Sequence, residues 1–169
     1  QIIAKQTSPV YLIYGHSLGA YLTLRVARML ENVDRAPAYI IVSGNPGPGI
    51  RDSKKRYLFD HNEFVKELRS LGGVPEEIFQ NKELFDFFEP ILRADFELAE
   101  RNDMPEETAV NVPIYALMGT EEEDGDKISN WKRFTNSTFQ SGLLEGDHFF
   151  IFKHPQRIAN LIKHCYKEL

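Results

Sequence analysis

The pentapeptide Gly15-His16-Ser17-Leu18-Gly19 constrains the fold more strongly than any other part of this sequence. The apolar run from Val10 to Tyr14 precedes it and is typical of a short buried strand. Apolar residues then recur at helical spacing, namely Leu18, Leu22, Val26, Met29 and Leu30. Glycines at both ends of the pentapeptide remove side chains where a strand and a helix must nearly touch. The sequence therefore predicts a strand, a sharp turn with strained backbone at Ser17, and a helix.

Ser17 is the candidate nucleophile of this chain. A serine at such a junction has its hydroxyl lifted clear of the sheet, where a substrate can reach it. The backbone N–H of Leu18 begins the helix, so it is the candidate donor to an oxyanion formed on the substrate. The alternative is an ordinary turn in which the side chain of Ser17 caps the helix.

The composition is that of an ordinary soluble globular domain, with 169 residues of which 42% are hydrophobic and 27% charged. The formal net charge of −5 and the lack of a face rich in lysine and arginine argue against nucleic acid as a partner. No apolar run approaches the roughly 20 residues that span a bilayer and no signal-peptide pattern is present, so we expect no membrane contact and a cytoplasmic location. The single cysteine, Cys165, lies on an apolar helical stripe and is expected to be a packed thiol. Cysteines and histidines at metal-ligand spacing are lacking, so neither a metal nor a cofactor is expected.

Further apolar runs predict strands at residues 38–42 and 112–118 and a short strand near Leu143 and Leu144. Residues 60–102 have a helical pattern without strands, a helix is expected around 131–134, and a closing helix is expected after Pro155. Strands separated by helices indicate an α/β fold, a mostly parallel sheet with helices on both faces. The loops at the carboxyl ends of parallel strands collect on one edge, so the turn at Ser17 and the loops after residues 118 and 144 should meet there.

A serine nucleophile needs a base to take its proton, and the base needs an acid that fixes its tautomer. Of the five histidines, His148 alone lies in a loop directly after a late strand, so it is the candidate base. The alternative is that His148 only bonds to neighbouring backbone. His16 adjoins the nucleophile but points in a different direction from the turn, and we expect a structural role for it. The three others, His61, His154 and His164, lie in or beside helices.

The acid is expected between Ser17 and the base in chain order, on the loop after the 112–118 strand. This loop carries several carboxylates. Glu122 is the first candidate, Asp124 the second, and Glu121 and Glu123 follow. A glutamate is an accepted variant of the acid in such a triad.

Further motifs occur in order through nearly the whole chain. They are the pentapeptide with Ala20, Ser43-Gly44, Phe64 with Leu68-Arg69, Leu71-Gly72-Gly73-Val74-Pro75, Asn81 with Glu83-Leu84, Pro90 with Leu92-Arg93-Ala94-Asp95-Phe96, Pro113-Ile114, Trp131 and Gly146-Asp147-His148-Phe149-Phe150. This series resembles type II thioesterases. The Leu-Gly-Gly-x-Pro and Leu-Arg-Ala-Asp-Phe segments are more specific than the pentapeptide, because general esterases do not share them.

The resemblance implies an α/β-hydrolase that removes acyl or aminoacyl groups from the phosphopantetheine arm of carrier proteins in nonribosomal peptide, polyketide and fatty-acid synthesis. Ser17 and His148 match the nucleophile and the base of that family. The acid there is usually an aspartate, and Glu122 with Asp124 nearby occupies the matching place. The helical region matches a lid over the acyl pocket, in which Phe88 and Phe96 would contact the substrate. A helical layer that only packs on itself is the alternative.

The resemblance also implies a division of the chain into three parts. Residues 1–44 match the core around the nucleophile, 45–108 the lid, and 109–169 the rest of the core with the acid and histidine loops. The N-terminal strands of the family and its Gly-rich oxyanion loop have no match here, so residues 1–169 alone are expected to be poorly soluble or oligomeric and nearly inactive. A carboxylesterase acting on small acyl esters, and an inactive hydrolase fragment that binds without turnover, are the alternatives to a thioesterase.

Overall fold

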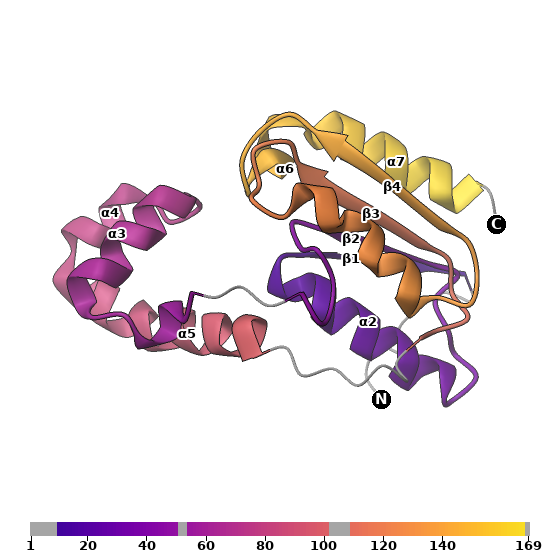
Figure 1. Ribbon diagram of the computed structural model, residues 1–169, viewed down its shortest axis with the longest axis horizontal. Helices are drawn as coiled ribbons and strands as arrows, with labels where there is room; N and C mark the ends of the chain where they lie inside the picture. Colours follow the sequence, from indigo (N-terminus) through magenta and orange to yellow (C-terminus); the bar gives the residue numbers. More distant parts are fainter. Residues whose placement is uncertain (1–9, 51–53, 102–108, 168–169) are drawn as a thin grey trace. The chain divides into compact units, whose positions relative to one another are not determined.

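The computed structural model describes residues 10–50, 54–101 and 109–167. The chain divides into two compact units (Figure 1). The sheet unit comprises Gln1–Pro48 with Met104–Leu169, and the helical unit comprises Gly49–Asp103. None of the helices formed by the described residues is long and apolar enough to cross a membrane.

The sheet unit is built on four parallel strands: β1 (Leu12–His16), β2 (Tyr39–Ser43), β3 (Ile114–Gly119) and β4 (Phe139–Leu144). They lie in chain order, β1-β2-β3-β4, so β1 is at one edge of the sheet formed by the described residues. The predicted parallel α/β fold is confirmed. The bounds of all four strands differ from the prediction. β1 runs on into the pentapeptide as far as His16, and β4 begins at Phe139, before the predicted apolar pair, because the polar residues Gln140 and Ser141 interrupt its apolar pattern.

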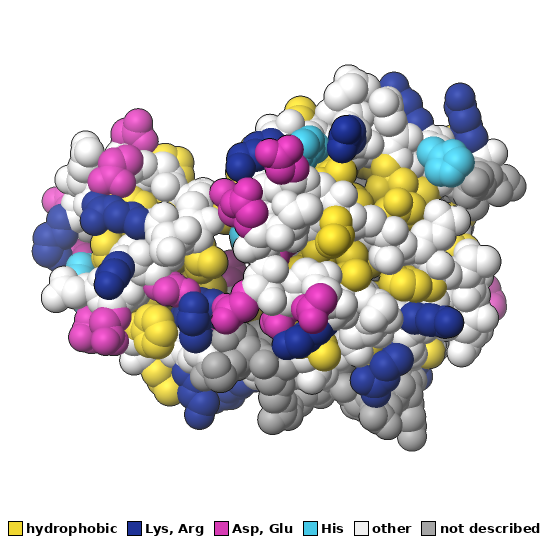
Figure 2. All heavy atoms as spheres, turned by 45° about the horizontal axis from the view of Figure 1, so that its top comes forward, with side chains coloured by type: hydrophobic (Ala, Val, Ile, Leu, Met, Phe, Trp, Pro, Cys, Tyr) yellow, Lys and Arg dark blue, Asp and Glu magenta, His cyan; other side chains and the backbone are white. Residues whose placement is uncertain are grey.

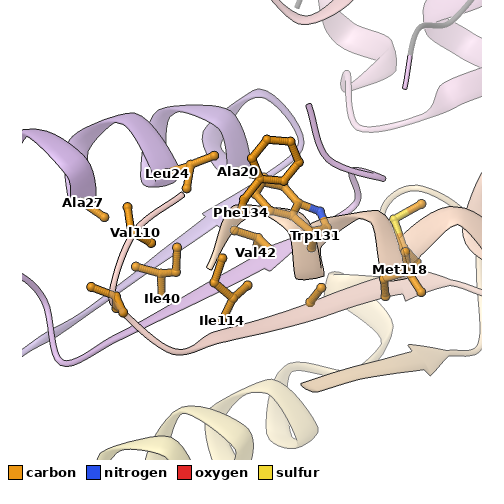
Figure 3. Packing of buried hydrophobic residues seen from close by; sticks show 13 residues of the cluster. Ala20, Leu24, Ala27, Ile40, Val42, Val110, Ile114, Met118, Trp131 and Phe134 are labelled. Carbon is orange, nitrogen blue, oxygen red and sulfur yellow. The ribbon is translucent and has the colours of Figure 1, made fainter. Parts of the chain in front are cut away.

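Helices cover both faces of the sheet, as predicted (Figures 1 and 3). One face packs against α2 (Leu18–Glu31) and the 3₁₀ helix η3 (Gly125–Phe134), which includes the helix expected near residues 131–134. The other face packs against α7 (Pro155–Lys167), which follows the short α6 (Phe150–Lys153). Successive side chains of a strand point to opposite faces of the sheet. Ile40 and Val42 of β2 therefore pack on the side of α2, and Tyr39 and Ile41 pack against Cys165 of α7 on the other side. Cys165 is buried, as expected.

The buried stripe of α2 is not the one that the apolar spacing suggested. Leu22 and Met29 are 52% and 62% exposed, whereas Ala20, Leu24 and Ala27 are fully buried (Figure 3). Small residues at the contact let the helix approach the sheet closely. Gly15 is required at this contact, because a Cβ on it would lie 2.1 Å from the carbonyl oxygen of Gly19 and 2.3 Å from Thr23 Oγ1. For Gly19 the expectation was wrong, since no described atom lies within 4 Å of a Cβ built there.

The helical unit contains η1 (Arg56–Leu58), α3 (His61–Leu71), α4 (Glu76–Gln80) and α5 (Lys82–Arg101), and no strand among its described residues, as the sequence indicated. The core of this unit is formed by Phe64, Leu68 and Phe85. Arg56 is buried against two carboxylates and donates to Glu67 at 2.8 Å and to Glu100 at 2.9 Å. The unit therefore has its own apolar core and its own buried ion pairs.

On the face drawn in Figure 2, basic side chains (dark blue) are interspersed with acidic ones (magenta).

The two glycines of the pentapeptide provide a matched test of the contact between β1 and α2. Gly15→Ala should lower the free energy of unfolding by about 1–3 kcal/mol, because the new methyl group overlaps backbone that cannot move away easily. Gly19→Ala should leave it unchanged or raise it by about 0.5–1 kcal/mol, because alanine is favoured within a helix. Denaturant unfolding of both variants checks this. Equal changes in the free energy of unfolding for Gly15→Ala and Gly19→Ala would contradict the close approach of strand and helix at Gly15.

Candidate active site

Three side chains from different loops meet at the carboxyl edge of the sheet. Ser17 follows β1, Glu122 follows β3 and His148 follows β4. The Ser17 Oγ lies 3.0 Å from His148 Nε2, and a carboxylate oxygen of Glu122 lies 2.9 Å from His148 Nδ1. The first candidate of each predicted kind is thus brought into one hydrogen-bonded chain, although Ser17 and His148 are 131 residues apart in sequence.

Ser17 has the strained backbone that the sequence predicted, with φ 57° and ψ −120°. A positive φ is costly for a residue other than glycine and persists only where surrounding bonds enforce it. Here the Ser17 N–H donates to the Ser43 carbonyl at 2.8 Å, and the Ser17 carbonyl accepts from the Asn45 side chain at 3.2 Å. The alternative of a capping serine is wrong, because the hydroxyl makes no cap hydrogen bond to α2. Leu18 is the first residue of α2, so its N–H lies at the helix N-terminus beside this hydroxyl.

The Glu122 carboxylate is held at both oxygens. Oε1 accepts from the Gly119 N–H at 2.7 Å, and Oε2 bonds to His148 Nδ1 at 2.9 Å. An ionised carboxylate can only accept, so Nδ1 carries the proton and Nε2 accepts from the Ser17 hydroxyl. Only 10% of the Glu122 side chain and 23% of the His148 side chain are exposed. Asp124, the second candidate, is paired instead with Lys127 at 2.5 Å.

The acid loop and the histidine loop are joined through their backbones. The Glu121 N–H donates to the Gly146 carbonyl at 3.0 Å. A Cβ on Gly119 would lie 2.4 Å from the Gly146 oxygen and 2.5 Å from the Asp147 oxygen, so only glycine allows this approach. Gly146 itself has φ 129°, a conformation that favours glycine. The spacing of Glu122 and His148 is therefore fixed by main chain as well as by side chains.

Sequence reasoning missed a second chain of polar groups next to the first. His16 Nδ1 lies 2.8 Å from Ser43 Oγ, which lies 2.8 Å from the Tyr14 hydroxyl. The His16 ring centroid is 5.0 Å from that of His148. Burial, together with the nearby His148, lowers the pKa of His16 to about 4. The strand register pairs His16 with Ser43, so this contact follows from strand pairing and had no local signal in the sequence.

Other predicted residues lie elsewhere. His61 pairs with Glu89 at 3.1 Å within the helical unit, and His154 bonds to the Glu145 carbonyl at 2.7 Å. In α5, Phe96 packs edge-on against Phe64 at 5.7 Å between ring centroids, and Phe88 packs edge-on against Phe87 at 5.3 Å. Within the described parts of the chain, no group of three or more histidine, cysteine or acidic side chains could hold a metal ion.

Comparisons with known proteins identify the family. Residues 1–168 match the thioesterase domain family. Gramicidin S biosynthesis protein GrsT of Aneurinibacillus migulanus is 30% identical, over 90% of this chain and 63% of its own length. The medium-chain S-acyl fatty acid synthase thioesterase of Rattus norvegicus is 29% identical, over 92% of this chain and 62% of its own.

A solved structure agrees as well. YbtT, a type II thioesterase from the yersiniabactin NRPS/PKS biosynthetic pathway, superposes with a TM-score of 0.89 at 25% identity, over 99% of this chain and 70% of YbtT. The chain spans about three-fifths of the length of the two curated relatives. With the family match extending over residues 1–168, this chain belongs to the thioesterase family.

Proposed function

We propose that this chain carries the active site of a type II thioesterase, which hydrolyses acyl or aminoacyl thioesters on the phosphopantetheine arm of carrier proteins through an acyl-Ser17 intermediate. The observation that carries the proposal is the hydrogen-bonded chain from Ser17 through His148 to Glu122. Such a chain is suited to nucleophilic acyl transfer. The family match supplies the thioester as the bond that is cleaved.

The first half-reaction transfers the acyl group to the enzyme. His148 Nε2 takes the proton of the Ser17 hydroxyl while Oγ attacks the thioester carbonyl carbon. The Leu18 N–H, at the start of α2, stabilises the negative oxygen of the tetrahedral intermediate. When the intermediate collapses, the carbon–sulfur bond breaks and the sulfur takes the proton from His148. Glu122 stays ionised and holds the proton on Nδ1 throughout.

The second half-reaction releases the acid. His148 Nε2 takes a proton from water while the water oxygen attacks the acyl carbon. The ester bond to Ser17 then breaks, and the proton returns from His148 to the serine oxygen. The enzyme is restored, and the product is a carboxylic acid.

The carrier-protein substrate is supported by the relatives. One is named for gramicidin S biosynthesis, one as a thioesterase of fatty acid synthase, and one as a type II thioesterase of an NRPS/PKS pathway. In each kind of synthesis the acyl chain travels as a carrier thioester, so the same substrate class is proposed here. We assign the reaction to the cytoplasm, with which the buried thiol of Cys165, the single cysteine of the sequence, is consistent.

We assign the acyl chain to the exposed apolar stripe of α5. Leu84, Phe87, Ile91 and Leu98 lie on one side of this helix and are 38%, 66%, 49% and 63% exposed. Large apolar side chains gathered on one exposed face mark a binding surface more often than scattered ones do. Phe88 adjoins this stripe through its contact with Phe87. Phe96 packs into the core of the helical unit, and we assign it a mainly structural role.

Substitutions in the triad test the mechanism. Ser17→Ala should lower kcat by about 10⁴-fold or more, because no other group supplies the nucleophile. Glu122→Gln should lower it by about 10³-fold, because a neutral amide cannot stabilise the imidazolium. The matched control Asp124→Asn should stay within about twofold, since Asp124 pairs with Lys127 near the surface. Steady-state kinetics of the intact natural protein decide this, and a larger loss in Asp124→Asn than in Glu122→Gln would reverse the assignment.

The same protein distinguishes the alternatives. A thioesterase of this class should hydrolyse an acyl group from a carrier protein faster than the same acyl group from a simple alcohol ester. Equal rates on both would favour a carboxylesterase. Labelling of Ser17 by a fluorophosphonate without turnover of either substrate would favour a protein that binds acyl groups without hydrolysis.

Substitutions of the phenylalanines in α5 should affect either the preference for acyl length or the stability of the protein. Phe87→Ala and Phe88→Ala should change the ranking of substrates by acyl length and leave the thermal midpoint nearly unchanged. Phe96→Ala should lower the free energy of unfolding by about 2 kcal/mol, because it removes a partly buried ring from its contact with Phe64. Kinetics with acyl thioesters of increasing length and thermal unfolding measure the two effects. An unchanged ranking in the first pair would remove the acyl chain from this stripe.

A further inference from the structure

A second histidine lies against the base of the proposed triad. His16 is the last residue of β1, and its ring centroid is 5.0 Å from that of His148, with 40° between the ring planes. On another side the ring meets the backbone of Gly44, where a Cβ would lie 2.4 Å from His16 Cε1. Phe149 and Phe150 also contact it, at 5.8 and 6.0 Å between centroids. The His16 ring therefore packs between Gly44, which follows β2, and the segment from His148 to Phe150.

Hydrogen bonds hold the His16 ring from the side away from solvent. Ser43 Oγ lies 2.8 Å from His16 Nδ1, and the Tyr14 hydroxyl lies 2.8 Å from Ser43 Oγ. Ser43 is fully buried. The other ring nitrogen, His16 Nε2, is buried and makes no hydrogen bond of good geometry among the described residues, although the His148 backbone lies close enough to favour a proton on the ring. A polar atom left unpartnered costs free energy, so an apolar side chain at position 16 would be favoured if stability alone mattered.

His148 needs support that its two hydrogen bonds do not give. Its bonds to Ser17 and Glu122 lie at the ring nitrogens and fix the ring mainly along the line between them. Tilting of the ring about that line changes the direction of the Nε2 lone pair relative to the Ser17 hydroxyl. A neighbouring ring that cannot move, such as His16 with its centroid 5.0 Å away, restricts this tilt by steric contact.

The supporting ring must also be uncharged. When His148 takes the Ser17 proton it becomes a cation, and a second cation 5.0 Å away would oppose that step. Burial keeps His16 neutral, and the pKa of about 4 reflects this. The groups that face His16 are His148, Ser43 with Tyr14 behind it, and the two phenyl rings of Phe149 and Phe150. The His148 backbone favours protonated His16, but burial and the nearby His148 side chain outweigh it and lower the pKa.

We propose that His16 is a positioning residue for His148, an uncharged ring fixed by Ser43 and Tyr14 that keeps the His148 imidazole aligned between Ser17 and Glu122. The proposal rests on the proposed catalytic role of His148. In this proposal His16, the last residue of β1, acts on the reaction only through His148.

Three substitutions test it. His16→Asn places an amide near the position of Nδ1, so it can still bond to Ser43, but it removes the ring face beneath His148. His16→Phe keeps a ring and removes the bond to Ser43. Ser43→Ala leaves His16 in place and removes the group that orients it. His164→Asn, at an exposed histidine of α7, is the matched control.

The expected result is a loss in kcat without a loss in binding. His16→Asn should lower kcat by about 100-fold, because small displacements of a catalytic group have effects of that size. His16→Phe and Ser43→Ala should lower it by about 10-fold, and His164→Asn should have no effect. KM for a thioester of a small thiol and the unfolding midpoint should stay near those of the parent protein. The NMR signal of the His148 Nδ1 proton should broaden in His16→Asn, since the bond to Glu122 is no longer held in one geometry.

Two outcomes would overturn the proposal. If kcat changes less than twofold in His16→Asn and in Ser43→Ala, His148 needs no support from His16. If kcat falls only in proportion to the amount of folded protein, the residues are structural; Ser43→Ala decides this should His16→Asn fail to fold. Failure of the proposed function gives a different pattern, in which Ser17→Ala keeps its activity.

The pH dependence of stability tests the neutral state of His16 separately. Its pKa is about 4 in the folded protein against 6.5 for a free histidine side chain. Above pH 6.5 the ring is neutral in both states. Between pH 6.5 and 4 the unfolded chain takes up a proton that the folded chain does not, so stability falls as pH falls, and below pH 4 the loss is complete.

His16→Phe should remove this contribution. The denaturant midpoint of the parent should fall relative to that of His16→Phe as the pH is lowered from 6.5 to 4, and the difference should then level off. Groups that lie away from residue 16 contribute equally to both curves and cancel in the comparison. Parallel curves for the two proteins would show that folded His16 takes up a proton as readily as the unfolded chain does, and the proposal of an uncharged support would be overturned.

Discussion

The strained backbone of Ser17 is the constraint on which the rest of the site depends. Its φ of 57° places the residue in a region that costs about 1–3 kcal/mol for a side chain other than glycine. Main-chain bonds at Ser17 N–H and carbonyl enforce it, to Ser43 and Ala20 respectively, and the Asn45 side chain adds a third bond. In this conformation the hydroxyl points to His148 instead of capping α2. Leu18, the next residue, begins α2, so one local conformation positions both the proposed nucleophile and the proposed oxyanion donor.

The parallel sheet brings residues that are far apart in the sequence close together at its carboxyl edge. Each strand runs beside its predecessor in chain order, so every loop that leaves a carboxyl end emerges next to the previous one. Glu122 illustrates how a longer acid fits here. Its side chain turns back so that Oε1 reaches the N–H of Gly119, the last residue of β3, while Oε2 reaches His148. A glutamate side chain is one methylene longer than that of aspartate, and here it folds back toward the end of β3. Its second carboxylate oxygen still reaches His148.

The sequence predicted the parts of the structure that depend on local pattern. The parallel sheet, both helical layers and the places of Ser17, His148 and Glu122 followed from apolar runs, the pentapeptide and the loops after strands. The sequence did not predict which side of α2 is buried, because helical spacing identifies apolar stripes but not the neighbour that covers them, and Leu22 and Met29 proved exposed. It also missed the link from Tyr14 through Ser43 to His16. That link depends on the register between β1 and β2, which no single stretch of sequence encodes.

The charges of the site explain why two histidines can lie together there. Before proton transfer the Glu122 carboxylate is the one formal charge of the triad, and it accepts from the Gly119 N–H and from His148. In the proposed mechanism, the cation formed on His148 would lie against that carboxylate, and the anion formed on the substrate would lie at the helix N-terminus near Leu18. Each charge created by the reaction thus meets a partner already in place. A charged His16 would have no such partner, whereas a neutral and buried His16 adds a rigid surface and leaves this balance unchanged.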